Sequence, residues 1–280
     1  MRRALGWSGL AILGVLMAWK LTAEIVEPHF LLWFAPRQPF LEARTIGDTT
    51  LRLYGDARPH VGKIAAMQKG LVWMQGRQAL VEEGYGFGCP IVESDGQAFL
   101  SRHAEIEVAL HGEVTRLIKH YDMDTVDTPI RLLRRKYRPV PSLGVVVVRY
   151  DVHPDGIIDV EVDFSGLKRA WNKAYLMNEQ GAHFFTRYRD SDGRQVGASE
   201  LGIWHQASPP PARACFDGSK VRLSFCVQVE EPVNLAVYYG RERYNQYNWR
   251  GIYYLAWSGV DIEIGGSRPS YRYRIVLEAQ

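Results

Sequence analysis

Residue types used in nucleophilic catalysis occur in the middle of the chain, but nothing in their spacing brings them together. His183 and His205 lie in strand-like segments, with Glu179, Ser199 and Glu200 nearby. A serine hydrolase needs a nucleophile, a base and an orienting acid within hydrogen-bond reach of one another. Because no motif here fixes that geometry, we predict no catalytic residues.

Neighbouring carboxylates are the second arrangement that could do chemistry, since two acids flanking a glycosidic bond suffice to hydrolyse it. Glu82 is followed by Glu83, and Asp159 and Glu161 share one side of an alternating segment. Acids on the polar side of a strand are normally just solvated. We therefore favour a non-catalytic protein over an enzyme.

Two short segments have some features of a cofactor or metal site. The glycine-rich segment 84–90 superficially has the glycines of a nucleotide-binding loop, but it ends in Cys-Pro where a helix would have to begin. Asp122, Asp124 and Asp127 offer oxygen ligands, yet they lack the glycine and terminal glutamate of a calcium loop. We predict a bend or bulge, a solvated acidic turn, no metal and no cofactor.

The segment from Tyr238 to Trp257 is the most unusual part of the sequence. Its loop, residues 241–250, mixes tyrosine and tryptophan with arginine and asparagine. Such residues are enriched at protein interfaces, and the same rings could stack on sugars. Packing in the core is the third explanation, because strand alternation buries about half of the rings. The predicted interface residues are Tyr244, Tyr247, Trp249, Arg241, Arg243 and Arg250.

A basic surface is predicted on a short helix. Asp127-Thr128-Pro129 supplies a helix cap and a first-turn proline, and Pro139 ends the segment. The cations could meet anionic lipid headgroups or an acidic partner, or they could pair with the protein's own acids. They are Arg131, Arg134, Arg135, Lys136 and Arg138.

The three cysteines, Cys89, Cys215 and Cys226, fit neither a zinc-site spacing nor a redox motif. If Asp217-Gly218 forms a tight turn, Cys215 lies opposite Lys220 rather than opposite Cys226. Buried free thiols are therefore expected, with a Cys215–Cys226 disulfide as the alternative.

An uncharged segment near the N-terminus, Ala4 to Trp19, follows two arginines and ends at Lys20. It is slightly shorter than the roughly 20 residues that span a bilayer, but an interfacial tryptophan and a snorkelling lysine could close the gap. We predict one transmembrane signal-anchor helix over 1–23, with a cleaved signal peptide as the alternative. The expected location is a bacterial-type cytoplasmic membrane, with most of the chain on the periplasmic side.

An apolar juxtamembrane segment is expected over 24–40. It is too short to span a bilayer and very apolar for a free linker, so it should lie in the membrane interface or against protein. The predicted membrane or partner contacts are Trp19, Lys20, Phe30, Leu31, Leu32, Trp33 and Phe34.

A β-rich extracytoplasmic domain is predicted over 41–280, because period-two alternation dominates the sequence from Leu51 onward, and the strands it predicts must position any site. Val221 to Val229 alternates apolar and polar residues, and so does Ile158 to Phe164. Asp-Gly pairs beginning at 95, 155, 192 and 217 are typical of tight turns between strands. The predicted fold is all-β, an antiparallel β-sandwich or barrel-like domain of one or two packed parts, preceded by one N-terminal transmembrane helix.

Composition and charge exclude two classes of protein. A hydrophobic fraction of 46% is that of a folded chain, and a net charge of +3 without a basic face argues against a nucleic-acid partner. The anchor, the apolar segment and the aromatic-arginine cluster favour a non-catalytic accessory or scaffolding subunit of a larger membrane protein complex. Its partners would be integral membrane subunits and the lipid bilayer. The alternatives are a membrane-tethered envelope protein that binds or cleaves glycans, and a β-barrel carrier of lipid or pigment.

Overall fold

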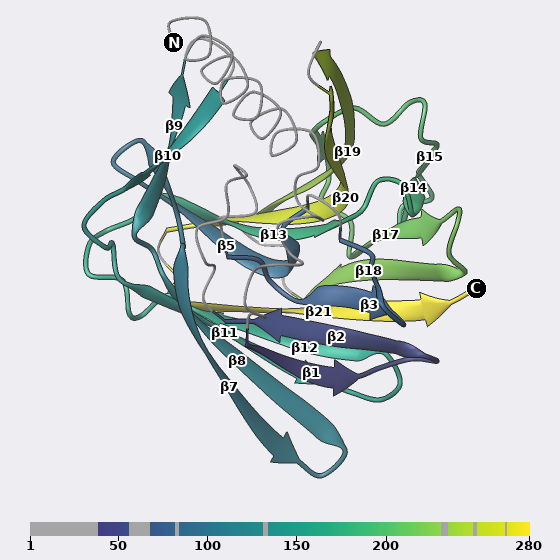
Figure 1. The fold of residues 1–280 in the computed structure, drawn as a ribbon, viewed down its shortest axis with the longest axis horizontal. Helices are drawn as coiled ribbons and strands as arrows, with labels where there is room; N and C mark the ends of the chain where they lie inside the picture. The colour runs from purple at the N-terminus through teal and green to yellow at the C-terminus, as the bar shows by residue number, and fades with distance from the viewer. Residues whose placement is uncertain are drawn as a thin grey trace, which may run out of the picture. The chain divides into compact units, whose positions relative to one another are not determined.

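The computed structural model describes residues 39–55, 68–81, 84–130, 134–230, 235–248, 251–266 and 268–280. Within these ranges the chain forms antiparallel strands and turns and contains no helix, which confirms the all-β prediction (Figure 1). None of the described elements is an apolar helix of membrane-spanning length. The predicted anchor over 1–23 and its contact residues, from Trp19 to Phe34, lie outside the described residues.

The chain divides into two compact units. The larger comprises Gln38–Arg243 and Ala256–Gln280, and it holds nearly all of the described strands. The smaller comprises Met1–Arg37 and Tyr244–Leu255, and its described part consists of the distal ends of β19 (Leu235–Asn248) and β20 (Gly251–Gly265).

Three antiparallel sheets make up the described structure. A four-stranded sheet has the order β1-β2-β3-β4, with β1 Phe40–Arg44, β2 Thr49–Tyr54, β3 Val72–Gln75 and β4 Gln78–Ala79. An eight-stranded sheet has the order β10-β9-β6-β5-β13-β20-β19-β16, with β5 Gly86–Ser94, β6 Gln97–Leu100, β9 Thr125–Ile130, β10 Arg134–Pro139, β13 Lys173–Gln180 and β16 His205–Ala207. A nine-stranded sheet has the order β15-β14-β17-β18-β21-β12-β11-β8-β7, with β7 His103–His111, β8 Val114–Asp122, β11 Val145–Val152, β12 Ile157–Asp163, β14 Phe185–Asp190, β15 Gln195–Val196, β17 Arg213–Gly218, β18 Leu223–Val229 and β21 Ser270–Ala279.

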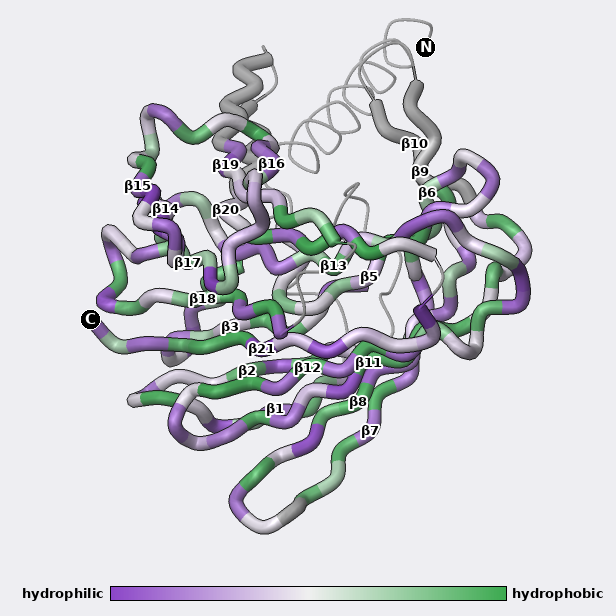
Figure 2. The backbone as a smooth tube through the Cα atoms, turned by 180° about the vertical axis from the view of Figure 1, so that it is seen from behind, coloured by the Kyte–Doolittle hydropathy of each residue, from purple (hydrophilic) through white to green (hydrophobic). Residues whose placement is uncertain are grey.

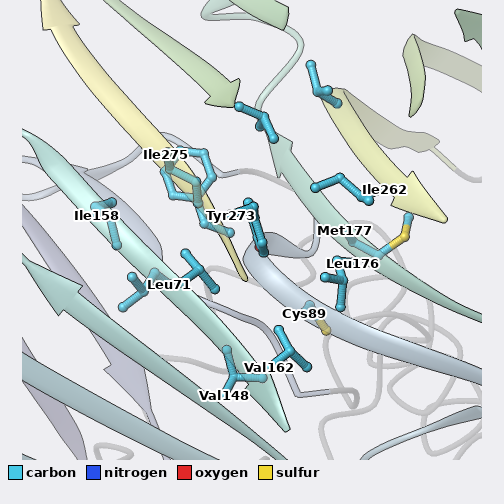
Figure 3. Close-up of a cluster of buried hydrophobic side chains, with 14 of the residues drawn as sticks. Leu71, Cys89, Val148, Ile158, Val162, Leu176, Met177, Ile262, Tyr273 and Ile275 are labelled. Atoms are coloured by element: carbon cyan, nitrogen blue, oxygen red, sulfur yellow. The ribbon is translucent and has the colours of Figure 1, made fainter. Parts of the chain in front are cut away.

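The eight-stranded and nine-stranded sheets enclose the main core, as in a β-sandwich. Leu176 and Ile262 from one sheet meet Val162 and Ile275 from the other (Figure 3). Aromatic rings fill another part of the same core, where the ring centroids of Phe225 and Phe87 lie 5.3 Å apart in an edge-on contact. Packed side chains therefore occupy the described part of this interior.

Alternation along the strands is the reason the core forms where it does. Hydrophobic and hydrophilic residues alternate along strand β12 of the nine-stranded sheet, as the sequence pattern predicts (Figure 2). Val148 of β11 lies opposite Val162 of β12, and both are buried. Gly156 adopts φ +92°, which confirms the tight turn expected between these two strands.

The acids on the polar side of the same strands form ion pairs with arginines. Asp159 accepts a hydrogen bond from Arg274 at 2.7 Å, and Glu161 accepts one from Arg272 at 3.1 Å. Arg116 donates two hydrogen bonds, at 2.6 and 2.7 Å, to Asp151. Each carboxylate is thus committed to an arginine of a neighbouring strand.

The predicted short basic helix is wrong, because its residues form a β-hairpin. Pro129 of β9 lies opposite Arg135 of β10, and Asp127 lies opposite Tyr137. Strand β9 also continues the eight-stranded sheet beyond β6, and this pairing outweighs the helix-capping pattern. Of the predicted basic residues, Arg134, Arg135, Lys136 and Arg138 lie on the edge strand β10, and Arg131 lies outside the described residues.

The expectation of free thiols is wrong for two of the three cysteines. Cys215 and Cys226 form a disulfide, with their Cα atoms 4.0 Å apart, while Cys89 is free and buried. The chain does not turn at Asp217-Gly218, which still belongs to β17. It turns over residues 219–222 instead, and this sets Cys215 directly opposite Cys226.

Reduction of this disulfide is expected to lower the free energy of unfolding by about 3 kcal/mol, since the bond removes entropy from the unfolded chain. The bond closes a sequence separation of 11 residues. Chemical denaturation with and without reductant measures the effect, and the variant carrying both Cys215→Ser and Cys226→Ser is the control that reductant should not change. A wild-type midpoint that reductant leaves in place would contradict the prediction.

Candidate functional site

The outward side of the central strands of the eight-stranded sheet gathers aromatic rings and acids. Ala174 and Leu176 of β13 face the core, as do Val260 and Ile262 of β20, so the residues between them face outward. Tyr175 and Glu263 lie opposite each other across these two strands. We call this surface the acid-aromatic face; its members are Glu93, Lys173, Tyr175, Glu179, Trp204, Tyr238, Asp261 and Glu263.

Three aromatic rings form the exposed part of the acid-aromatic face. Trp204 stacks on Tyr238 with centroids 4.9 Å apart and an interplanar angle of 20°, and its centroid lies 5.4 Å from that of Tyr175. Trp204 is 40% exposed. The rings therefore offer an accessible apolar surface at the sheet.

Close backbone contact places Trp204 over strand β19. The preceding segment rests on Gly240, where an added Cβ would lie 2.0 Å from the carbonyl oxygen of Ile203. The backbone N–H of Arg241 donates to the carbonyl of Gly202 at 2.9 Å. Trp204 then leads into β16, an edge strand that pairs with β19.

Charged groups lie beside the rings. The hydroxyl of Tyr238 donates to Glu263 at 3.1 Å, and the Lys173 ammonium lies 3.3 Å from Glu263 and 3.7 Å from Glu93. A hydrogen bond to Tyr175, followed by the charges of Glu263 and Glu93, raises the pKa of Lys173. Lys173 therefore stays charged, and two carboxylates balance it.

Two further acids of the face are buried. Asp261 accepts hydrogen bonds from the backbone N–H of Asn178 at 2.9 Å and from Trp204 Nε1 at 3.0 Å. Burial raises the pKa of Asp261 to about 7. This carboxyl group therefore changes its charge near neutral pH, directly beneath an exposed ring.

Glu179 is the second buried acid, and two glycines leave room for its side chain. Its carboxylate accepts a hydrogen bond from the backbone N–H of Tyr85 at 2.9 Å. Burial and then the charge of Asp261 raise the pKa of Glu179 well above its usual value. A Cβ added at Gly259 would lie 2.8 Å from Glu179 Cγ, and one at Gly84 would lie 3.0 Å from its Cβ. Buried acids with such pKa values are more frequent at functional sites than elsewhere.

The glycine-rich segment forms the predicted bulge rather than a nucleotide loop. Cys89 pairs with Met177 and Phe87 pairs with Asn178, which leaves Gly88 as the extra residue of β5. Asn178 Oδ1 accepts hydrogen bonds from the N–H of Gly88 at 3.1 Å and from the Tyr273 hydroxyl at 3.0 Å. The bulge is therefore part of the polar network that holds β13 in place.

The structure does not assemble the triad-type residues considered from the sequence. His205 Nε2 accepts a hydrogen bond from the N–H of Gly202 at 3.0 Å, which is a local loop contact. Ser199 and Glu200 are exposed on a separate turn. The described residues contain no cluster of ligands suited to a metal ion, so the expectation of no metal stays a prediction.

The predicted loop over 241–250 is instead strand as far as Asn248, so Arg241, Arg243, Tyr244 and Tyr247 belong to β19. Arg241 donates to the carbonyl oxygens of Ala182 at 3.0 Å and Ala198 at 3.5 Å, so its side chain stabilises two other backbone segments of the same domain. Trp249 and Arg250 lie outside the described residues.

Sequence reasoning found only part of the acid-aromatic face. Of the C-terminal aromatic cluster, Tyr238 lies on this face, whereas its neighbour Tyr239 is buried and stacks on Tyr188 at 3.9 Å. Trp204 and Asp261 were missed as site residues. The alternation of Val260, Ile262 and Ile264 is the signal that places Asp261 and Glu263 together on the opposite side.

The sequence matches no protein-family model and no curated protein. Its structure is similar to that of the alpha-N-acetylgalactosaminidase NagBb from Bifidobacterium bifidum. The GalNAc complex of that enzyme gives a TM-score of 0.51 at 8% identity, covering 85% of this chain and 36% of NagBb. The quadruple mutant gives 0.52 at 9% identity. A GalM/aldose epimerase homologue from C. elegans reaches 0.41 at 10% identity, over 87% of this chain and 99% of that one, which is too low to carry an argument.

The chain thus spans about a third of the length of NagBb, at 36% coverage, and at this identity the likeness shows the fold alone. Together, the fold and the acid-aromatic face define a β-sandwich protein with a candidate ligand-binding surface on one sheet.

Proposed function

We propose that the acid-aromatic face binds carbohydrate. The observation that carries this proposal is the half-exposed ring cluster of Trp204, Tyr238 and Tyr175 directly beside the polar groups of Glu263 and Lys173. A sugar ring presents C–H groups that pack on aromatic faces and hydroxyls that hydrogen-bond to carboxylates. The proposal corresponds to the glycan-binding alternative, but on residues other than those of the C-terminal loop.

The role supported is binding rather than cleavage. Hydrolysis needs two carboxyl groups that reach the glycosidic bond from either side. Asp261 is 0% exposed and Glu179 is 3% exposed, and the Trp204 side chain contacts Asp261. The titrating acids are thus closed off beneath the rings. The similarity to NagBb, solved with GalNAc, adds that this fold occurs in an enzyme that binds a sugar.

The charge around the rings indicates the kind of sugar. Lys173 is balanced by Glu93 and Glu263, so the accessible groups carry no excess positive charge. An acidic sugar would meet these carboxylates unfavourably. We therefore expect neutral or amino sugars to bind in preference to uronic acids.

A glycan array with the full-length chain, followed by calorimetric titration of the best ligand, tests the proposal. Trp204→Ala should lower the affinity about tenfold, which corresponds to roughly 1.4 kcal/mol. Phe40→Ala is the matched control, because Phe40 is exposed to a similar extent, 42%, on the separate strand β1. An array without any bound glycan, or equal affinities for wild type and Trp204→Ala, would overturn it.

The membrane-anchored accessory subunit remains a prediction, since its anchor and contact residues lie outside the described ranges. Purification in mild detergent tests it independently of sugar binding. Co-purifying membrane proteins would support this role, whereas an isolated monodisperse monomer would count against it.

A further inference from the structure

We propose a second binding site, for a small organic anion, in a hollow of about 490 Å³ at the end of strands β5 and β6. Three stretches of chain line it: the β5–β6 hairpin from Ser94 to Phe99, the segment 140–142, and the pair Lys168 and Arg169. We call it the hairpin hollow. Its volume lies in the range of ordinary ligand sites, of the order of 300 to 1,000 Å³.

Hydrogen bonds fix the walls of the hairpin hollow. Ser94 Oγ donates to the carbonyl of Ala170 at 2.8 Å, which ties the hairpin to the segment that carries the two cations. The N–H of Lys168 donates to Leu143 at 2.9 Å, and the N–H of Val140 donates to Asp124 at 2.8 Å. These hydrogen bonds hold the backbone of the three segments that line the hollow.

Two cations, Lys168 and Arg169, are among the residues that line this hollow. The guanidinium of Arg169 lies 5.9 Å from the ring centroid of Phe99, a cation–π contact that holds it over this ring. No described carboxylate forms an ion pair with Lys168 or Arg169. Asp95 is the acid among the lining residues, and the hollow keeps a net positive charge.

The arginines of the nine-stranded sheet differ from the cations of the hairpin hollow, because they form ion pairs. Arg116, Arg272 and Arg274 each contact a carboxylate across the sheet, at 2.6, 3.1 and 2.7 Å respectively. The hairpin hollow is lined by Lys168 and Arg169 together with the apolar residues Phe99, Val140 and Pro141. This combination suits a carboxylate or phosphate attached to a compact ring, because the anionic group can meet the cations while the ring covers the apolar residues.

Such an anion could come from an acidic sugar or from an aromatic acid, and matched probes separate the two sources. Saturation-transfer NMR on the full-length chain would compare glucuronate with glucose, and benzoate with benzyl alcohol. The sugar pair is measured in the Trp204→Ala variant, so that binding at the acid-aromatic face does not contribute. We expect an anion to bind about fivefold more tightly than its neutral counterpart, and the tighter anion identifies the source.

Charge variants then locate the binding in the hairpin hollow. Arg169→Gln should lower the affinity for the anion about threefold to fivefold, and Asp95→Asn should raise this affinity by a similar factor, since each variant changes one charge near the ligand. Asn tolerates the backbone of Asp95, whose φ is +51°. Lys220→Gln, an exposed lysine in the β17–β18 turn, is the control that should change nothing. Anions that bind no better than their neutral counterparts, or variants that do not shift affinity in opposite directions, would overturn the proposal.

Discussion

The free energy of unfolding is expected to fall by on the order of 4 kcal/mol between about pH 4 and pH 8 on account of one buried carboxyl group in the acid-aromatic face, that of Asp261. Its pKa is about 7 in the folded protein, against an ordinary value of 3.8. Between these values the folded state holds a proton that the unfolded state has released.

Stability falls as the pH rises because the folded state keeps this proton. A folded state that binds more protons than the unfolded state loses stability as the pH rises. Below about pH 4 both states are protonated and this group has no effect, and above its folded pKa the full penalty of burying the charge is present. Glu179 makes the decline steeper from about pH 4.5 upward and extends it to higher pH, because burial and the charges of Asp261 and Glu242 raise its pKa, while the Tyr85 N–H and Lys69 lower it.

Glu179→Gln isolates the second acid. Between about pH 4.5 and pH 7 the variant should lose stability less steeply than the wild type, because only Asp261 then releases a proton on unfolding. Above about pH 7 the variant should level off while the wild type continues to lose stability. Denaturant unfolding at several pH values measures the two profiles. Glu105→Gln, an exposed acid on β7, is the control and should reproduce the wild-type profile. If Glu179→Gln and the wild type decline in parallel from about pH 4.5 to pH 7, Glu179 carries no raised pKa.

Alternation of residue types was sufficient to predict the sheets but not the site. It predicts β12 and β18, because one buried face imposes a period of two on each strand. The helix expected from Asp127-Thr128-Pro129 failed for a reason outside its own sequence, since β9 forms by pairing with β6 and β10. Capping patterns describe local preference, and tertiary pairing outweighs it.

The site depends on contacts between residues distant in sequence. Trp204 reaches Asp261 across a separation of 57 residues, and Glu179 reaches Tyr85 across 94. No local pattern encodes either contact. The disulfide shows the same limit on a smaller scale, because shifting the turn from Asp217-Gly218 to residues 219–222 changes which residue faces Cys215.

Gly88→Ala is expected to destabilise the protein by about 3 kcal/mol, the sum of a left-handed backbone and an overfilled core. Gly88 has φ +73°, and a Cβ there would lie 2.7 Å from Tyr150 Cε1 and 2.9 Å from its hydroxyl oxygen. Tyr150 is fully buried, and its hydroxyl donates to the carbonyls of Phe87 and Gly88 at 3.1 Å each. Moving the ring would leave that hydroxyl without its partners.

Gly96→Ala separates the two contributions. Gly96 has a nearly identical φ of +71°, but an added Cβ meets nothing within 4 Å. Its substitution should therefore cost only about 1 kcal/mol, the backbone part. Equal losses for the two variants would show that Tyr150 moves without cost and that the bulge is not tightly packed.

If Gly88→Ala costs more, the double variant with Tyr150→Phe should lose less stability than the sum of the two single variants, since both changes act on one contact. The bulge also places Phe87 in the core and lets the N–H of Gly88 donate to Asn178. The fit of Gly88 against Tyr150 therefore links the packing of the sandwich to β13, the strand that carries Glu179.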